Sequence, residues 1–367
     1  MYLEMTAVAL GFLLAAGTAQ AAAPGGSHGP VPREHITIRR RDEHPCVNRT
    51  PAEVTAAHRR VEKHAWARDM RDGIVAAADG WLQKDEAHWL SLRPAPGACY
   101  AYGSSGCPIC GASTGYRWHK ANATWDLPRH VTCDHGHVLP DADHPDDGTG
   151  YTAEDGRKHY FIGQWNAWAT EEWTCKAIPL LSEAYLLTGE ERYAERCGFF
   201  LDLIASVYPE SASGSWDYPS DPPSGRLARP WYQVARTLVI FVDAYDAVCP
   251  SRALDAPSCR EGLTRRRNIE ENLLLDGADY CHRHSFGGVL HNGHADYMRG
   301  ALAVGCLMDI QEYIEPAVSG PYSIGVMLAN NIDRDSRYYE TALLYANHTR
   351  ELYVSFAEPL LRLRNAE

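Results

Sequence analysis

Apolar residues recur every three or four positions along most of this chain, the spacing that places them on one face of an α-helix. The stretch from 165 to 209 shows this spacing at Trp173, Ile178, Leu181 and Tyr185. Residues 188–190, Thr-Gly-Glu, end one helix and begin the next, which predicts an αα-hairpin. No convincing strand alternation is found. The pattern therefore predicts an all-α fold, in which serial αα-hairpins form a helical toroid with a cleft made by the loops at one end.

Residues 94–160 interrupt this pattern, because they are dense in Gly, Pro, Cys, His and Asp and have little period of either kind. Two turns in this insertion, "CPICG" and "CDHGH", offer five candidate metal ligands: Cys107, Cys110, Cys133, His135 and His137. Thiolates and an imidazole on two such turns form the closed ligand set of structural zinc, which would stabilise a loop that gains little from burial. The alternative is a disulfide within the set, with solvated histidines.

The N-terminal residues predict export. An apolar stretch is followed by Ala-Gln-Ala, so residues 1–21 are interpreted as a signal peptide and the mature protein as secreted or periplasmic. Residues 22–45 are expected to be a flexible lead-in, and residues 46–367 a single helical domain. No other apolar run approaches the length that spans a bilayer, so no membrane association is expected after signal removal.

Helix signals and cysteine count add two expectations. Thr50 is a candidate N-cap, followed by one long helix or two. The eleven cysteines cannot all pair internally, but Cys249 and Cys259 flank a short loop and could form a disulfide. Buried free thiols are expected at the cysteines within apolar helical patterns: Cys175, Cys197, Cys281 and Cys306.

Charge and aromatic content narrow the partners. A net charge of −12 argues against nucleic acid, which needs a basic surface. Ten Trp and 20 Tyr against seven Phe favour rings with a polar edge, as carbohydrate-binding clefts use, although each could simply fill the core.

Titratable and hydrogen-bonding groups are concentrated in two places. "HNGHADYMRG" begins at His291 and includes Asn292, His294 and Arg299. "DRDSRYYETALLYANH" lies about 45 residues later, and on a helix its Tyr345 and His348 would share one face.

At these residues the chain resembles the heparinase II/III-like and alginate-lyase-like polysaccharide lyases. The resemblance rests on "YLLTGEERYAERC", "HNGH", "DRDSRYYETALLY" and the "CPICG" and "CDHGH" insertion, and covers most of residues 46–363. It implies an incomplete (α/α) toroid and places Asn292 and His294 on a uronate carboxylate, with Tyr345 handling the proton. The segment departs from the family pattern at Arg334 and Ala342. Family members continue into a β-sandwich, whereas this sequence stops after a helical pattern, so either a fragment or a toroid without the β-sandwich is expected.

The chemistry implied by the resemblance agrees with the residue types. A proton next to an ionised carboxylate can be removed only if that charge is neutralised and the enolate is stabilised by placed donors. A tyrosine phenol, with an ordinary pKa near 10, needs nearby cations or hydrogen bonds to act as a base. The candidates to supply them are His291, His294, Arg299 and His348.

The expected function is therefore β-elimination on a uronic-acid glycan, with an anionic polysaccharide as substrate. A uronate C5-epimerase would begin with the same proton abstraction, and a non-catalytic glycan-binding toroid would need none of the chemistry. A glycoside hydrolase would need two facing carboxylates, for which Asp296 and Glu340 are available. Further residues are expected to bind substrate, because they combine polar and aromatic groups or supply local positive charge: Gln164, Trp165, Asn166, Trp168, Trp216, Arg226, Arg229, Arg299 and Tyr339. The alternative for the two loops that carry most of them is packing on the helices.

Overall fold

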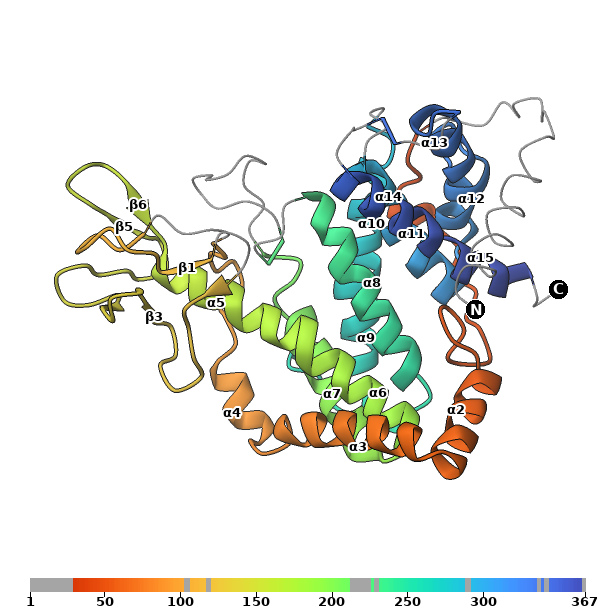
Figure 1. Cartoon of the computed structure of the whole chain (residues 1–367), viewed down its shortest axis with the longest axis horizontal. Helices are drawn as coiled ribbons and strands as arrows, with labels where there is room; N and C mark the ends of the chain where they lie inside the picture. The colour runs from red at the N-terminus through yellow and green to blue at the C-terminus, as the bar shows by residue number, and fades with distance from the viewer. Residues whose placement is uncertain are drawn as a thin grey trace. The chain divides into compact units, whose positions relative to one another are not determined.

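The computed structural model describes residues 29–101, 106–116, 120–211, 226–227, 231–287, 292–334, 338–339 and 343–364. In these ranges the chain is mostly helical, and its strands form three two-stranded antiparallel sheets (Figure 1). The helical class expected from the periodicity is confirmed, whereas the small sheets were not expected. None of the helices in the described ranges is both long and apolar enough to cross a membrane.

The chain divides into two compact units. Unit 1 comprises residues 1–58, 235–249 and 274–367, and unit 2 comprises residues 59–234 and 250–273. Each unit is therefore assembled from segments that are distant in the sequence.

Unit 2 contains the insertion and the helices on which it packs. Its helices are α3 (Ala65–Gly80), α4 (Glu86–Ser91), α5 (Phe161–Glu172), the π-helical turn η2 (Trp173–Ala177), α6 (Ile178–Thr188), α7 (Glu191–Ala205), η3 (Arg252–Asp255), α9 (Arg265–Ile269) and η4 (Glu270–Leu274), whose last residue belongs to unit 1. Its sheets pair β1 (Gly115–Tyr116) with β2 (Lys120–Ala121), β3 (Val131–Thr132) with β4 (Val138–Leu139), and β5 (Tyr151–Thr152) with β6 (Lys158–His159).

The predicted αα-hairpin forms the core of unit 2. Gly189 ends α6 with φ +70°, a left-handed conformation that glycine adopts without strain, and α7 begins two residues later. Helix α7 is buried along most of its length because α6 and α9 pack against it. At Gly198 a Cβ would come within 2.8 Å of the end of the Leu254 side chain, so α7 and η3 pack closely at this position.

Unit 1 is built around α11 (Asn292–Met308). Its other helices are η1 (Arg33–His35), the first half of α2 (Pro51–Lys63), α8 (Trp231–Val248) from Ala235 onward, α10 (Leu275–His284), α12 (Gln311–Ser319), α13 (Ile324–Asn331), α14 (Leu343–Ser355) and α15 (Ala357–Arg364). Helices α10, α12, α14 and α15 all contact α11. Gly300 allows α11 to approach α8, since a Cβ there would lie 2.8 Å from the Cβ of Ala235.

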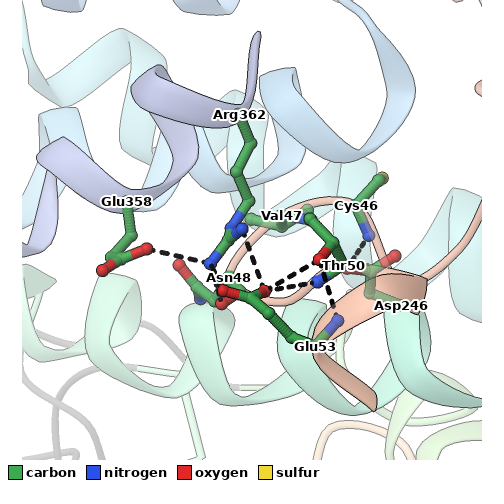
Figure 2. A network of polar contacts seen from close by, with 8 residues as sticks. All are labelled: Cys46, Val47, Asn48, Thr50, Glu53, Asp246, Glu358 and Arg362. Carbon is green, nitrogen blue, oxygen red and sulfur yellow. Dashed lines mark hydrogen bonds and ion pairs between the residues drawn. The ribbon is translucent and has the colours of Figure 1, made fainter. Parts of the chain in front are cut away.

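The start of α2 is fixed by a reciprocal cap. The Glu53 backbone N–H donates to the Thr50 hydroxyl at 3.2 Å, and the Glu53 carboxylate accepts from the Thr50 backbone N–H at 2.8 Å (Figure 2). Arg362 of α15 forms an ion pair with Glu53 at 3.0 Å and another with Glu358. The predicted N-cap is confirmed, and α2 and α3 are two separate helices because His64 between them is extended.

The N-terminal segment is described from Gly29 onward, so the predicted signal peptide lies outside the described residues. Within the expected lead-in, the Val31 N–H donates to His282, the Arg39 N–H to the Met308 carbonyl, and the Arg41 side chain to the Cys306 carbonyl. The described part of this segment is thus held by α10 and α11.

All eleven cysteines are free thiols, so the disulfide considered for Cys249 and Cys259 is not formed. Cys259 is held instead by a bond from its backbone N–H to the Asp202 carboxylate at 2.7 Å. Cys197, Cys281 and Cys306 are buried as expected. The prediction for Cys175 was wrong: it is exposed, because it lies in η2, where the wider π-helical turn interrupts the 3.6-residue periodicity.

Candidate functional site

The first turn of the insertion carries two candidate metal ligands, Cys107 and Cys110. The Gly111 N–H donates to the Cys107 carbonyl at 2.8 Å, and the Cys107 N–H donates to the Ala112 carbonyl at 2.7 Å. Gly111 has φ +73°, which allows the chain to reverse so closely. Both thiols consequently lie on one tight loop.

The second turn connects β3 to β4 and carries Cys133 and His137. The Cys133 N–H donates to the His137 carbonyl at 2.9 Å, and Gly136, with φ +87°, closes the turn. The Asp134 N–H donates to the Ser113 carbonyl at 2.9 Å, which joins this turn to the first one.

The ligand atoms of the four residues lie within 4.8 Å of one another, so the cluster could hold a metal ion such as zinc. The Cys110 and Cys133 sulfurs are 3.9 Å apart, and the His137 Nδ1 is 3.3 Å from the Cys133 sulfur and 3.8 Å from that of Cys107. Zinc bonds of about 2.3 Å to sulfur and 2.0–2.1 Å to nitrogen place tetrahedral ligand atoms roughly 3.6–3.8 Å apart. The observed separations are close to these values.

The two buried thiols of the cluster differ in their electrostatics. Burial opposes ionisation of Cys133, but hydrogen bonds from the backbone N–H groups of His137 and His135 and from neighbouring side chains lower its pKa to about 6. Burial raises the pKa of Cys107, partly offset by backbone hydrogen bonds in its own turn. The Cys133 thiolate is the more readily available ligand.

Four of the five predicted ligands come together, and His135 does not join them. It is exposed at the tip of the β3–β4 turn, two residues from each of the ligands in that turn. The chain reverses between Cys133 and His137, which brings these two residues together and leaves His135 exposed at the tip.

Further contacts of the insertion lie at the start of α5. The His159 Nδ1 hydrogen-bonds to the Gly106 carbonyl at 2.9 Å, and burial lowers the pKa of this histidine. The Asp146 carboxylate accepts from the backbone N–H groups of Gly148, Gly150 and Ile162 at 2.8–2.9 Å. These bonds join the insertion, which carries the candidate metal ligands, to the start of α5.

Three residues predicted to bind substrate are buried in the same contact. Gln164 accepts from the Thr114 hydroxyl at 3.0 Å, and Asn166 donates to the Cys99 carbonyl at 2.9 Å. Trp165 is fully buried. The described role of all three is to hold the insertion on α5, and their role in substrate binding stays a prediction.

Trp168 belongs to an aromatic cluster centred on Trp125 of the insertion. The Trp125 ring lies 4.5 Å from that of Trp168, and the indoles of Trp81, Trp89, Trp165 and Trp173 lie within 5.2–6.2 Å of it. Packing of aromatic rings therefore also attaches the insertion to the helices of unit 2. The family resemblance and the spacing of the cysteines and histidines did not predict this contact.

A polar cluster in unit 1 brings together three helices. Arg236 of α8 donates from Nε and Nη2 to both oxygens of Asp296 on α11, with 2.7 Å for the shortest bond. The same Nη2 lies 2.9 Å from Nε2 of His348 on α14. Asp296 is 3% exposed and Arg236 is 38% exposed, so a buried carboxylate orients a guanidinium that still reaches solvent.

The imidazole of His348 has a defined protonation state. Burial, and then the adjacent Arg236 guanidinium, lower its pKa, so the ring is neutral at neutral pH. Because Arg236 can only donate, Nε2 is the acceptor and the proton of the neutral ring lies on Nδ1. His348 is thus a hydrogen-bond donor with a fixed orientation.

Tyr345 lies one turn before His348 on α14 and is 47% exposed. Residues three apart share a helix face, so the phenol and the imidazole are on the same side of α14. Leu343 and Leu344, which begin the helix, are also exposed. Tyr339, with a predicted role in substrate binding, is exposed and packs against the ring of Tyr338.

The "HNGH" residues lie at the start of α11. Asn292 begins the helix, and His291 lies outside the described residues. His294 is buried, with its ring edge-on to Tyr322 at 5.3 Å. Arg299 is buried too and donates to the Ser355 hydroxyl at 3.2 Å, and burial lowers its pKa.

Of the predicted loop residues, Trp216 and Arg229 lie outside the described residues, as does Glu340. Arg226 donates to the Tyr208 carbonyl at 2.9 Å and lies over the Tyr208 ring at 5.0 Å. These contacts connect Arg226 to Tyr208.

Sequence reasoning missed Arg236, the residue that connects this cluster. The available signal was its position in α8, where it is a lone cation in the otherwise apolar stretch from Val234 to Val242. A cation in such a stretch is expected to have a buried partner.

No protein-family model matches the chain, and no curated protein matches it either. Its function is therefore inferred from its own residues.

Proposed function

We propose that this protein is a polysaccharide lyase that cleaves a uronic-acid glycan by β-elimination. The observation that carries the proposal is the position of the exposed Tyr345 three residues before His348 on α14, where Arg236, held by Asp296, bonds to the imidazole. The incomplete (α/α) toroid belongs to the same proposal, supported by the packed helix pairs α6–α7, α10–α11 and α11–α12.

The first step is removal of the proton next to the uronate carboxylate. Tyr345, as phenolate, takes this proton, and the electron pair of the C–H bond delocalises toward the carboxylate as an enolate. Positive charge and placed donors must stabilise this enolate. Arg236 and the Nδ1 proton of His348 supply them, and Asn292 and His294 keep the carboxylate-neutralising role that the resemblance implies.

The second step expels the glycosidic oxygen. The enolate electrons form a carbon–carbon double bond, the bond from carbon to the glycosidic oxygen breaks, and the Tyr345 phenol returns its proton to that oxygen. The products are a new hydroxyl end and an unsaturated uronate. The same tyrosine acts as base and then as acid, so no other proton carrier is needed.

The test is the ultraviolet absorbance of the unsaturated uronate during incubation with alginate, heparan, chondroitin and hyaluronan. Tyr345→Phe should lower the initial rate by about 10²–10⁴-fold, the usual contribution of a general acid–base group. His348→Gln should reduce it as well. The matched control is Tyr185→Phe, which removes a phenol that donates to Glu191 in unit 2 and should leave the rate unchanged.

Other outcomes would indicate one of the alternative functions, a C5-epimerase or a glycan-binding protein. Incorporation of deuterium from D2O into the glycan without rising absorbance would indicate an epimerase. Glycan binding that Tyr345→Phe leaves intact, with no turnover on any substrate, would indicate a binding protein. A rate unaffected by Tyr345→Phe would refute the assignment of this residue.

A structural zinc ion at Cys107, Cys110, Cys133 and His137 is the second part of the proposal. Four protein ligands complete a tetrahedral shell and leave no position for water, so the ion would stabilise the fold and take no part in the reaction. The two-residue strands of the insertion cannot be stable alone, which supports a metal as their cross-link.

The zinc content of purified variants tests this part. Cys107→Ser should contain one zinc fewer per chain than the wild type and should become sensitive to proteolysis between residues 106 and 160. Cys175→Ser removes an exposed thiol outside the cluster and should retain the wild-type content. Equal zinc in all three proteins would exclude the centre.

A further inference from the structure

A second cluster of possible metal ligands lies in unit 1, where residues 44–47 pack against the end of α8. The Asp246 carboxylate accepts from the backbone N–H groups of Cys46 and Val47, both at 2.8 Å, through one oxygen (Figure 2). One turn earlier on α8, Asp243 accepts from the side chain of Asn48. The loop is therefore held in one conformation over α8.

The Cys46 thiol and the Asp246 carboxylate lie against the imidazole of His44. Its Nδ1 lies 2.7 Å from the other oxygen of Asp246 and 3.7 Å from the Cys46 sulfur. Cys249, directly after the end of α8, is a further hydrogen-bonding partner of this ring. Asp246 is 2% exposed and His44 is 13% exposed, so the cluster is largely shielded from water.

The separations within this cluster suit a tetrahedral ion. The ligand atoms of His44, Cys46 and Asp246 lie within 4.8 Å of one another. Tetrahedral zinc would place sulfur and nitrogen about 3.6 Å apart, and nitrogen and oxygen about 3.3 Å apart. The sulfur–nitrogen separation already fits, and the 2.7 Å pair would open by roughly half an ångström.

We propose that His44, Cys46 and Asp246 form a second metal site that binds a zinc-type transition ion, and that Cys249 moves toward the ion to become its fourth ligand. Two thiolates, an imidazole and a carboxylate are donors for zinc or cobalt, whereas magnesium and calcium prefer oxygen ligands alone. One Asp246 oxygen would bind the metal while the other keeps its two backbone N–H bonds, which orient the carboxylate as outer hydrogen bonds do at metal sites. Binding displaces the protons of both thiols and of the Nδ1 atom.

The site would cross-link segments that are about 200 residues apart in the sequence. It would join the loop before α2 to the end of α8, and so connect two of the three segments of unit 1. This role concerns the stability of unit 1 and is independent of the lyase reaction and of the zinc centre in unit 2.

The experiment measures zinc bound to the full chain, purified under reducing conditions and incubated with Zn²⁺ alone before excess metal is removed. The wild type and the Cys175→Ser control should each bind two ions per chain. Cys46→Ser and Cys249→Ser should each bind one, Cys107→Ser should bind one, and the double variant of Cys46 and Cys107 should bind none. Zinc should raise the melting temperature of Cys107→Ser and leave that of the double variant unchanged.

Cobalt gives a separate signature, because the two-thiolate site should produce thiolate-to-cobalt absorption in Cys107→Ser that disappears when Cys46 is also replaced. Both single serine variants keep the bond between His44 and Asp246, so the fold of unit 1 should survive and circular dichroism should match the wild type. Unchanged zinc content in folded Cys46→Ser and Cys249→Ser would overturn the proposal. So would a disulfide between the two cysteines in a non-reduced digest of the protein as purified.

Discussion

His282 provides a direct test of how burial determines the pH dependence of stability. Its side chain is 1% exposed on α10, between the rings of Phe286 and Tyr313, and its Nε2 accepts from the Val31 N–H at 2.9 Å. Burial lowers the pKa from the ordinary 6.5 to about 4, although the nearby Asp279 acts in the opposite direction. Protonation would place a charge in the core and remove the acceptor of Val31.

The sign and size of the effect follow from proton linkage. The unfolded chain binds the proton near pH 6.5 and the folded chain only near 4, so the contribution of His282 to stability is full above pH 6.5 and is lost as pH falls toward 4. The complete loss corresponds to about 3 kcal/mol, and between pH 7.5 and pH 5 it amounts to about 2 kcal/mol.

His282→Gln isolates this contribution, because the amide is neutral at every pH and its oxygen can still accept from Val31. Urea unfolding of both proteins at pH 7.5, 6 and 5 gives the free energies of unfolding. The wild type should lose about 2 kcal/mol more than the variant between pH 7.5 and pH 5. His35→Gln, which removes an exposed imidazole from η1, should behave like the wild type. Equal losses in the wild type and His282→Gln would refute the reasoning.

Two further substitutions test the packing of unit 1. Arg236→Gln should lower the free energy of unfolding by about 3 kcal/mol, because Asp296 would stay buried without its bidentate partner. Arg236→Lys should lower it by less. If urea titrations show equal, negligible losses for both variants, this reasoning is wrong. Gly300→Ala should cost about 1–3 kcal/mol, because its Cβ would lie 2.8 Å from that of Ala235. The matched control is Gly73→Ala, because the space around this helical glycine is open, and it should stabilise the protein by up to about 1 kcal/mol. Thermal melts that shift by the same amount in both variants would contradict the close packing at Gly300.

The cluster of candidate metal ligands in unit 2 could be predicted because its residues are local in sequence. Two short turns carry all four ligands, and the glycines that close the turns are visible in the sequence. The choice between His135 and His137 could not be made from composition. It depends on how the chain reverses between β3 and β4, where His137 comes close to Cys133 and His135 lies exposed at the tip.

The polar cluster of unit 1 could be predicted only in part. Tyr345 and His348 lie on one helix, so their spacing alone places them together. Arg236 and Asp296 come from two other helices, and their pairing depends on how α8, α11 and α14 pack. The contact of Gln164 with Thr114 could not be predicted either, because the two residues are 50 positions apart in the sequence.

The interleaved segments of the two units impose an order on synthesis. Residues 1–58 are made first, yet unit 1 is incomplete until residues 274–367 have followed, whereas unit 2 needs nothing beyond residue 273. At about 5–20 residues per second, the earliest segment waits for tens of seconds on the ribosome without its partners. Residues 29–58 therefore stay accessible to chaperones during the whole of that interval.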